Sequence, residues 1–132
     1  PVNTAPRVSA LSFLLALGCA SPTSPDPIGQ WGSNDANLTL SRSGGTIEYG
    51  CGLGTIDSTW SVGTSGRFTA TGMHFTEGGP VPIGGIPPHP ARYLGTLQGR
   101  WLTLSVTLTD LNQTLGPYSL ERGKTGSLVK CY

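Results

Sequence analysis

Two histidines are the side chains in this sequence best suited to acid–base chemistry. His74 follows Phe68 with the parity of a strand, so it faces inward if that strand is regular. We expect a bulge at Gly72, where glycine commonly marks one, and a bulge would turn His74 to solvent. Strand parity also places Glu48 and Asp57, the carboxylates that could assist it, on the outer face. A hydrolase that uses His74 is therefore the least favoured hypothesis, and no catalytic residue is predicted.

The second histidine lies in a Pro/Gly-rich stretch, TEGGPVPIGGIPPHPA, over residues 76–91. Its prolines and glycines exclude a helix or a central strand and predict a loop. Loops of this length in small domains are commonly functional, so this one is a candidate surface for a partner. Trp101 is out of phase with its strand neighbours and is expected on the outside. The residues proposed for partner contact are Glu77, Pro80, Ile83, Ile86, His89 and Trp101.

The three cysteines divide into one plus two. Cys19 follows an apolar segment, whereas Cys51 and Cys131 both end strand-like runs. In an exported protein the remaining pair predicts a disulfide, with two buried thiols as the alternative. A zinc site is not expected, because the sequence has no CxxC motif. No metal and no cofactor is predicted.

The N-terminal segment has the composition of an export signal. Arg7 precedes an apolar run over residues 8–17, which has the length of a signal-peptide core and is too short to span a bilayer. The stretch LALGCA, followed by Ser and Pro, resembles a bacterial lipoprotein signal with its lipobox. The resemblance implies a signal peptide over residues 1–18, lipidation of Cys19 and a tether over residues 19–27. An ordinary secretory signal cleaved nearby is the alternative.

Charge argues against nucleic acid as a partner. Charged residues make up 11% of the chain, against roughly 25% in an average soluble domain. The formal charge is +1, and the basic residues are scattered singly, whereas phosphate binding needs several convergent cations. The chain has eight basic and seven acidic side chains. Removal of the signal would remove Arg7, so seven basic side chains would remain against seven acidic ones and the net charge would be zero. Membrane attachment would then depend on lipid, since two acyl chains anchor a protein stably.

The stretch from Arg92 to Asp110 sets the fold class. Leucines and Val106 alternate with Thr and Ser over residues 102–109, a period of two that is typical of a strand. Gln98-Gly99 supplies the turn of a hairpin. With that turn Leu97 faces Arg100, Gly95 faces Leu102 and Tyr93 faces Leu104, and one side of the hairpin is apolar.

Further short strands follow one another from Ile28 at about ten-residue spacing. We expect a turn over residues 52–54, a strand near Leu115 and a last strand from Ser127 to Cys131. These features predict about eight antiparallel strands. We expect them to form an up-and-down β-barrel over residues 28–132, because a closed barrel has no open sheet edges. A β-sandwich of the immunoglobulin type is the alternative.

The opening of this domain carries a family resemblance. Gly29-x-Trp31 on the first strand of a meander looks like the start of a calycin, the superfamily of lipocalins and avidin-like barrels. The resemblance implies that Trp31 packs at the closed end of the barrel with a late basic residue across it, for which Arg122 is the match. The stretches GRFTATG, ARYLGTLQG and LTLSVTLTD are similar to uncharacterised bacterial lipoproteins, a group with no established activity.

The favoured hypothesis is therefore a lipid-anchored binding module of the bacterial envelope, on its periplasmic or extracellular side. Ala20 after the lipidated cysteine favours the outer membrane. The partner is a small apolar ligand or an envelope protein. The alternative is a structural or inhibitory protein with a solid barrel that the aromatic residues simply fill. The candidates for lining a pocket are Trp31, Tyr49, Trp60, Tyr93 and Tyr118.

Overall fold

The computed structural model describes residues 26–131, which form an antiparallel all-β fold. These residues include no helix long and apolar enough to cross a membrane. The predicted signal peptide (1–18), Cys19 and the tether as far as residue 25 lie outside the described residues. The strands are β1 (Gly29–Gly32), β2 (Ala36–Ser41), β3 (Gly44–Tyr49), β4 (Gly52–Ile56), β5 (Ser61–Val62), β6 (Arg67–Thr76), β7 (His89–Gln98), β8 (Trp101–Leu108) and β9 (Gln113–Arg122).

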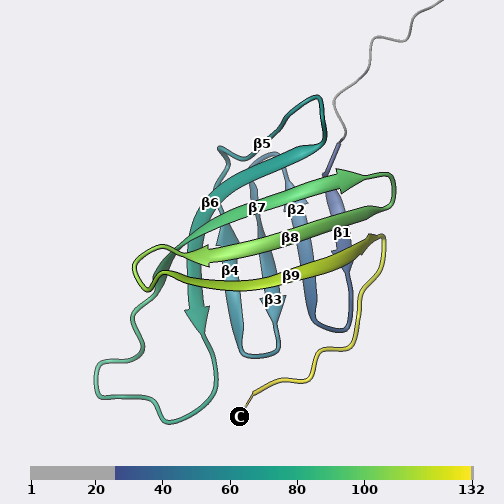
Figure 1. Ribbon diagram of the computed structural model, residues 1–132. Coiled ribbons are helices and arrows are strands. Elements are labelled where there is room, and N and C mark those ends of the chain that lie inside the picture. The colour runs from purple at the N-terminus through teal and green to yellow at the C-terminus, as the bar shows by residue number, and fades with distance from the viewer. Residues whose placement is uncertain (1–25, 132) are drawn as a thin grey trace, which may run out of the picture.

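Eight of these strands close into a barrel (Figure 1). Neighbours in the chain pair with one another, except that β1 pairs with β9 and β4 pairs with β6, and these two contacts complete the circle. The short strand β5 is additional and pairs with β6 alone. The predicted antiparallel β-barrel is thus confirmed, and the β-sandwich alternative is not what forms.

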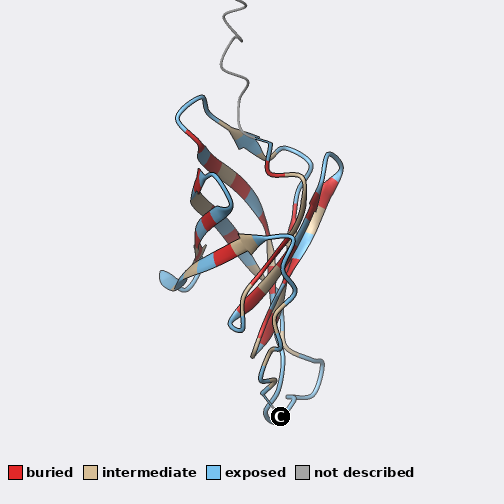
Figure 2. Ribbon diagram, turned by 90° about the vertical axis from the view of Figure 1, so that its right-hand side faces the viewer, coloured by how far each residue is buried: buried red, intermediate tan, exposed pale blue. Residues whose placement is uncertain are grey.

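Buried residues alternate with more exposed ones along the strands (Figure 2), and the buried side chains fill the barrel. On β8 the inward Leu102, Leu104, Val106 and Leu108 are all buried, as their alternation with Thr and Ser predicts. The largest fully buried side chains are Trp31, Tyr93 and Phe68. The core is therefore the barrel interior.

The β7–β8 hairpin has the predicted inner face but a different register. Gln98 pairs with Trp101, so the turn is Gly99-Arg100 in place of Gln98-Gly99, and Gly99 has a positive φ of 58°. Leu97 consequently faces Leu102, and Tyr93 faces Val106. Moving the turn by one residue moves every cross-strand partner by two, which leaves the same side chains pointing inward.

Three predictions about strand boundaries were wrong. Residues 52–54 belong to β4 and not to a turn, and residues 127–131 form no strand. The expected bulge at Gly72 is absent, because β6 pairs with β7 in continuous register through this residue and with β4 from this residue to Thr76. Gly72 instead permits a close approach: a Cβ there would overlap the carbonyl oxygen of Thr55 on β4.

The two ends of the barrel differ. At one end Trp31 is fully buried, and its Nε1 donates to the carbonyl oxygen of Pro27 at 2.8 Å. The Arg122 guanidinium lies 4.3 Å from the Trp31 ring centroid and also donates to the carbonyl oxygen of Asp26. We call this the closed end, and the end with the β3–β4 and β8–β9 turns the open end.

The close approach at Gly72 generates a stability prediction. Gly72→Ala should lower the free energy of unfolding by about 3 kcal/mol, because the new methyl group must push β6 away from β4. Denaturant titration followed by tryptophan fluorescence measures this loss.

Gly63→Ala is the control, since a Cβ at Gly63 has no neighbour closer than 3.9 Å. Its effect should stay within about 1 kcal/mol of zero. Equal effects of the two substitutions would contradict the tight β4–β6 contact.

Candidate functional site

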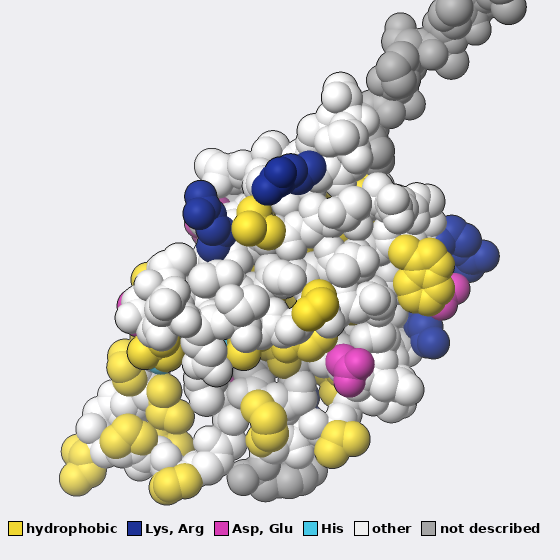
Figure 3. All heavy atoms as spheres, in the orientation of Figure 1, with side chains coloured by type: hydrophobic (Ala, Val, Ile, Leu, Met, Phe, Trp, Pro, Cys, Tyr) yellow, Lys and Arg dark blue, Asp and Glu magenta, His cyan; other side chains and the backbone are white. Residues whose placement is uncertain are grey.

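A pocket of about 560 Å³ lies at the open end of the barrel. It is bounded by the β1–β2, β3–β4 and β8–β9 turns, the end of β6 and the chain after β9. On the face shown in Figure 3, yellow hydrophobic side chains gather towards this lower end, whereas the dark blue basic ones lie higher. The volume is within the usual range for small-molecule sites. The pocket is lined by Asn34, Asp35, Tyr49, Gly50, Cys51, Gly52, His74, Thr76, Leu108, Leu111, Gln113, Leu115, Tyr118 and Val129.

Three aromatic rings form the inner wall of the pocket. The ring centroid of Tyr49 on β3 lies 5.5 Å from that of His74 on β6 and 5.5 Å from that of Tyr118 on β9. Because β6 has no bulge, His74 keeps the inward parity of Phe68, and it is 5% exposed. Tilted rings at this spacing offer both aromatic faces and polar atoms to a ligand.

Two buried polar atoms of this wall have no hydrogen-bond partner among residues 26–131: Tyr49 Oη and His74 Nδ1. Burial raises the pKa of Tyr49, so its phenol stays protonated. Burial, followed by the nearby His89, lowers the pKa of His74, so its imidazole is neutral at pH 7. Buried polar groups are nearly always satisfied, so two unpaired ones on residues that line one pocket are unusual.

Unlike the phenol of Tyr49, the phenol of Tyr93 on β7 has a hydrogen-bond partner. Its hydroxyl donates to the carbonyl oxygen of Thr55 at 3.0 Å, and burial raises its pKa to about 12. Space for this ring comes from Gly54 on β4, since a Cβ there would overlap the Tyr93 hydroxyl. In the same way a Cβ at Gly52 would lie 2.7 Å from His74 Cε1. The glycines that resembled a turn in the sequence thus make room for inward aromatic side chains.

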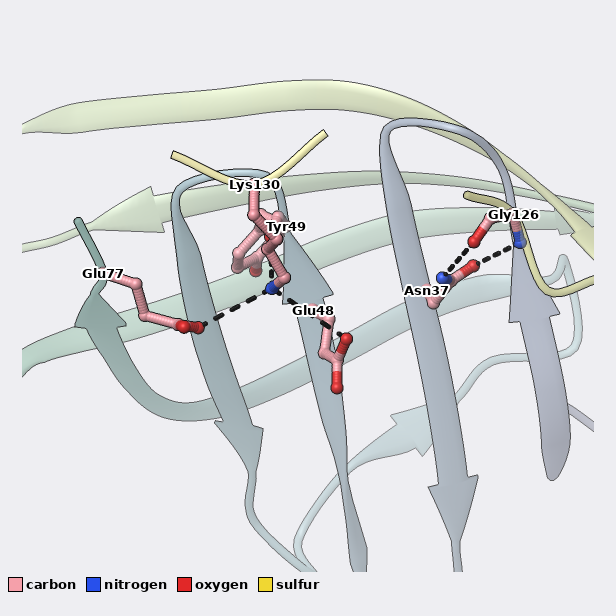
Figure 4. Close-up of polar contacts among 6 residues, drawn as sticks. All are labelled: Asn37, Glu48, Tyr49, Glu77, Gly126 and Lys130. Atoms are coloured by element: carbon pink, nitrogen blue, oxygen red, sulfur yellow. Dashed lines mark hydrogen bonds and ion pairs between the residues drawn. The ribbon is translucent and has the colours of Figure 1, made fainter. Parts of the chain in front are cut away.

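The C-terminal segment, residues 123–131, crosses the open end and forms one side of the pocket. The Cys51–Cys131 disulfide joins it to the β3–β4 turn, as predicted, with Cα atoms 4.8 Å apart. Lys130 Nζ donates to the carbonyl oxygen of Tyr49 at 3.0 Å and lies 4.0 Å from Glu48 and 3.8 Å from Glu77 (Figure 4). These contacts hold the segment against β3 and against the chain after β6.

A second attachment lies nearer the start of this segment. Asn37 Nδ2 donates to the carbonyl oxygen of Gly126, and the Gly126 N–H donates back to Asn37 Oδ1 at 2.8 Å (Figure 4). The backbone between Gly126 and Cys131 is therefore fixed at both ends, although it forms no strand. Val129 lies between these anchors, 87% exposed, at the rim of the pocket.

The aromatic residues predicted to line a pocket divide into two groups. Tyr49 and Tyr118 line it, whereas Trp31 lies at the closed end and Tyr93 is in the filled interior. Trp60 packs against Phe68 away from the pocket, and its Nε1 donates to the carbonyl oxygen of Ser41. His74 completes the wall. Strand parity with Phe68 places it on the inner face, and only the expected bulge at Gly72 led to the prediction that it would face solvent.

The residues proposed for partner contact do not form one surface. The loop itself spans residues 77–88, with Pro80 and Ile83 exposed and Ile86 partly buried, and Glu77 approaches Lys130. Trp101 is exposed as predicted, but it begins β8 at the other end of the ten-residue strand β7, roughly 30 Å from the loop.

His89 was predicted to be a solvated loop residue and is instead the first residue of β7. Its Nδ1 lies 2.6 Å from the Asp110 carboxylate, and this hydrogen bond lowers the pKa of Asp110. The pair joins β7 to the β8–β9 turn beside the pocket. It does not contribute to the pocket lining.

Neither carboxylate considered as an assistant to His74 lies beside it. Glu48 and Asp57 are exposed on the outer face, as strand parity predicts. Among the residues that the structure describes, no three His, Cys, Asp or Glu side chains are grouped to hold a metal ion. What the arrangement supplies is shape, aromatic surface and hydrogen-bonding groups.

Comparison with known proteins matches the chain to no family model, no curated protein and no solved structure. The geometry of the pocket therefore carries the functional argument.

The unpaired phenol generates a prediction for two neighbouring tyrosines. Tyr49→Phe should leave the free energy of unfolding unchanged or raise it by up to about 1 kcal/mol, because it removes a buried hydroxyl that has no partner. Tyr93→Phe should lower it by about 1 kcal/mol, because the bond to Thr55 is lost. Denaturant titration of both variants checks the difference, and a greater loss for Tyr49→Phe would contradict the assignment.

His74 generates a pH prediction. Its folded pKa lies below the ordinary 6.5, so the unfolded chain takes up a proton that the folded protein does not. The contribution of this residue to the free energy of unfolding is fully present above pH 6.5. It is lost as the pH falls below 6.5, and the free energy of unfolding then decreases by at most about 1.4 kcal/mol per pH unit. Unfolding titrations between pH 5 and 8 should show a steeper slope for the wild type than for His74→Gln. Identical slopes would rule out a neutral buried imidazole.

Proposed function

We propose that this protein is a non-catalytic binding module that holds a small, mainly apolar molecule in the pocket at the open end. The observation that carries the proposal is a pocket of about 560 Å³ lined by two residues, Tyr49 and His74, that each have a buried polar atom without a hydrogen-bond partner among residues 26–131. A cavity that served packing alone would be lined by apolar groups, since an unpaired buried polar group costs about 1 to 3 kcal/mol.

Leucine side chains supply the apolar part of the site. Leu108 is buried, Leu115 is partly buried, and Leu111 is 51% exposed at the rim. A ligand that covers these side chains gains about 25 cal/mol for each Å² of apolar surface removed from water. The hydrogen-bonding groups would then fix its orientation.

The proposal places the protein in the bacterial envelope, anchored through lipid on Cys19 and delivered to the outer membrane. The Cys51–Cys131 disulfide supports an exported location, since disulfides persist in oxidising compartments. Asp26, where the described chain begins, contacts Arg122 at the closed end. A tether that enters there would hold the barrel by its closed end, so the pocket would open away from the membrane.

A fluorescence titration with the neutral apolar probe N-phenyl-1-naphthylamine tests this function. The wild-type protein should bind the probe saturably with one site for each chain. Leu115→Trp should weaken binding at least about tenfold, because the indole fills pocket volume.

Thr114→Trp is the matched control, since Thr114 is exposed, precedes Leu115 on β9 and does not line the pocket. It adds the same side chain and should leave the dissociation constant unchanged. No saturable binding by the wild type, or equal loss in both variants, would overturn the proposed function.

A further inference from the structure

The charge around the open end is unbalanced. The turns and strand ends there carry the four carboxylates of Asp35, Glu48, Glu77 and Asp110, against the two ammonium groups of Lys124 and Lys130 on the C-terminal segment. Lys130 lies near Glu48 and Glu77, so two carboxylates share one ammonium group. Asp35 forms no ion pair with the described residues. The pocket mouth therefore has a negative potential, which raises the local concentration of cations.

The pocket lining has the same bias. Asp35 is the one lining residue of the described chain that carries a full charge at pH 7, and neither Lys nor Arg lines the pocket. Tyr49 and Tyr118 present aromatic rings, whose negatively charged faces attract cations. An anionic ligand would find no cationic partner at this site.

The unpartnered polar atoms can also serve as acceptors. A phenol oxygen has free lone pairs, and Nδ1 of a neutral imidazole accepts when the proton is on Nε2. Asp35, Tyr49 and His74, which all line the pocket, thus each carry an acceptor atom. The donors that match them are the N–H groups of an ammonium.

We infer that the ligand is an organic cation, an amine with an apolar or aromatic body, whose ammonium group lies among Asp35, Tyr49 and Tyr118. This inference rests on the proposed function and narrows it to one chemical class. The apolar body would cover Leu108 and Leu115.

Isothermal titration with three indoles that differ in charge tests the inference: tryptamine (cation), tryptophol (neutral) and indole-3-propionate (anion). Tryptamine should bind about five- to tenfold more tightly than tryptophol, and indole-3-propionate more weakly than both. The preference should shrink as sodium chloride is raised from 20 to 500 mM, because salt screens charges at an open mouth.

Asp35→Asn should weaken tryptamine about three- to fivefold and leave tryptophol unchanged. Asp57→Asn is the matched control, an exposed carboxylate remote from the pocket, and should change neither. Equal affinities of the three indoles, in a protein that still binds N-phenyl-1-naphthylamine, would overturn the cation class and leave the binding function standing. Failure of the neutral probe and of all three indoles would overturn both.

Discussion

The pairing of β4 with β6 is the constraint on which the rest of the structure depends. These strands are not consecutive, and their register from Gly52–Thr76 to Ile56–Gly72, together with the pairing of β1 with β9, closes the sheet into a barrel. The contact is possible because Gly72 has no side chain to hold the two backbones apart. Closure removes the exposed edges of the eight strands and gives all their inward residues one interior to fill. The filled end, the pocket and the direction of each aromatic ring follow from it.

The period of two was enough to predict the fold class and the inner face of most strands. On β8 every inward residue was identified, because Leu and Val alternate there with Thr and Ser without interruption. The register of the β7–β8 hairpin was less predictable, since Gly99 can stand at either position of a two-residue turn. The disulfide was predicted from the number of cysteines. Its position at the open end depends on where residues 123–131 run, which no periodicity encodes.

Glycine accounts for the errors that concealed the pocket. Gly52 and Gly54 appeared to form a turn, and Gly72 a bulge, because glycine inside a strand usually weakens it. Here Gly52 and Gly54 make space that His74 on β6 and Tyr93 on β7 occupy, and Gly72 lets the backbones of β4 and β6 approach each other. Whether a glycine ends a strand or admits a ring from across the sheet depends on tertiary contacts. The pattern of residues along the chain does not show those contacts.

The unpaired polar groups at the pocket lower the stability of the fold, and a disulfide and hydrogen bonds at the same end of the barrel offset this loss. Leaving Tyr49 and His74 without partners sacrifices free energy that leucine side chains at the same positions would keep. The Cys51–Cys131 bond closes a loop of 80 residues, for which chain entropy gives about 4 to 5 kcal/mol. This bond and the Lys130 contacts lie at the end where packing is incomplete, whereas the closed end is filled by Trp31 and needs no crosslink. Covalent stabilisation beside an underfilled, polar interior is the arrangement expected where a site is kept open for a ligand at the expense of packing.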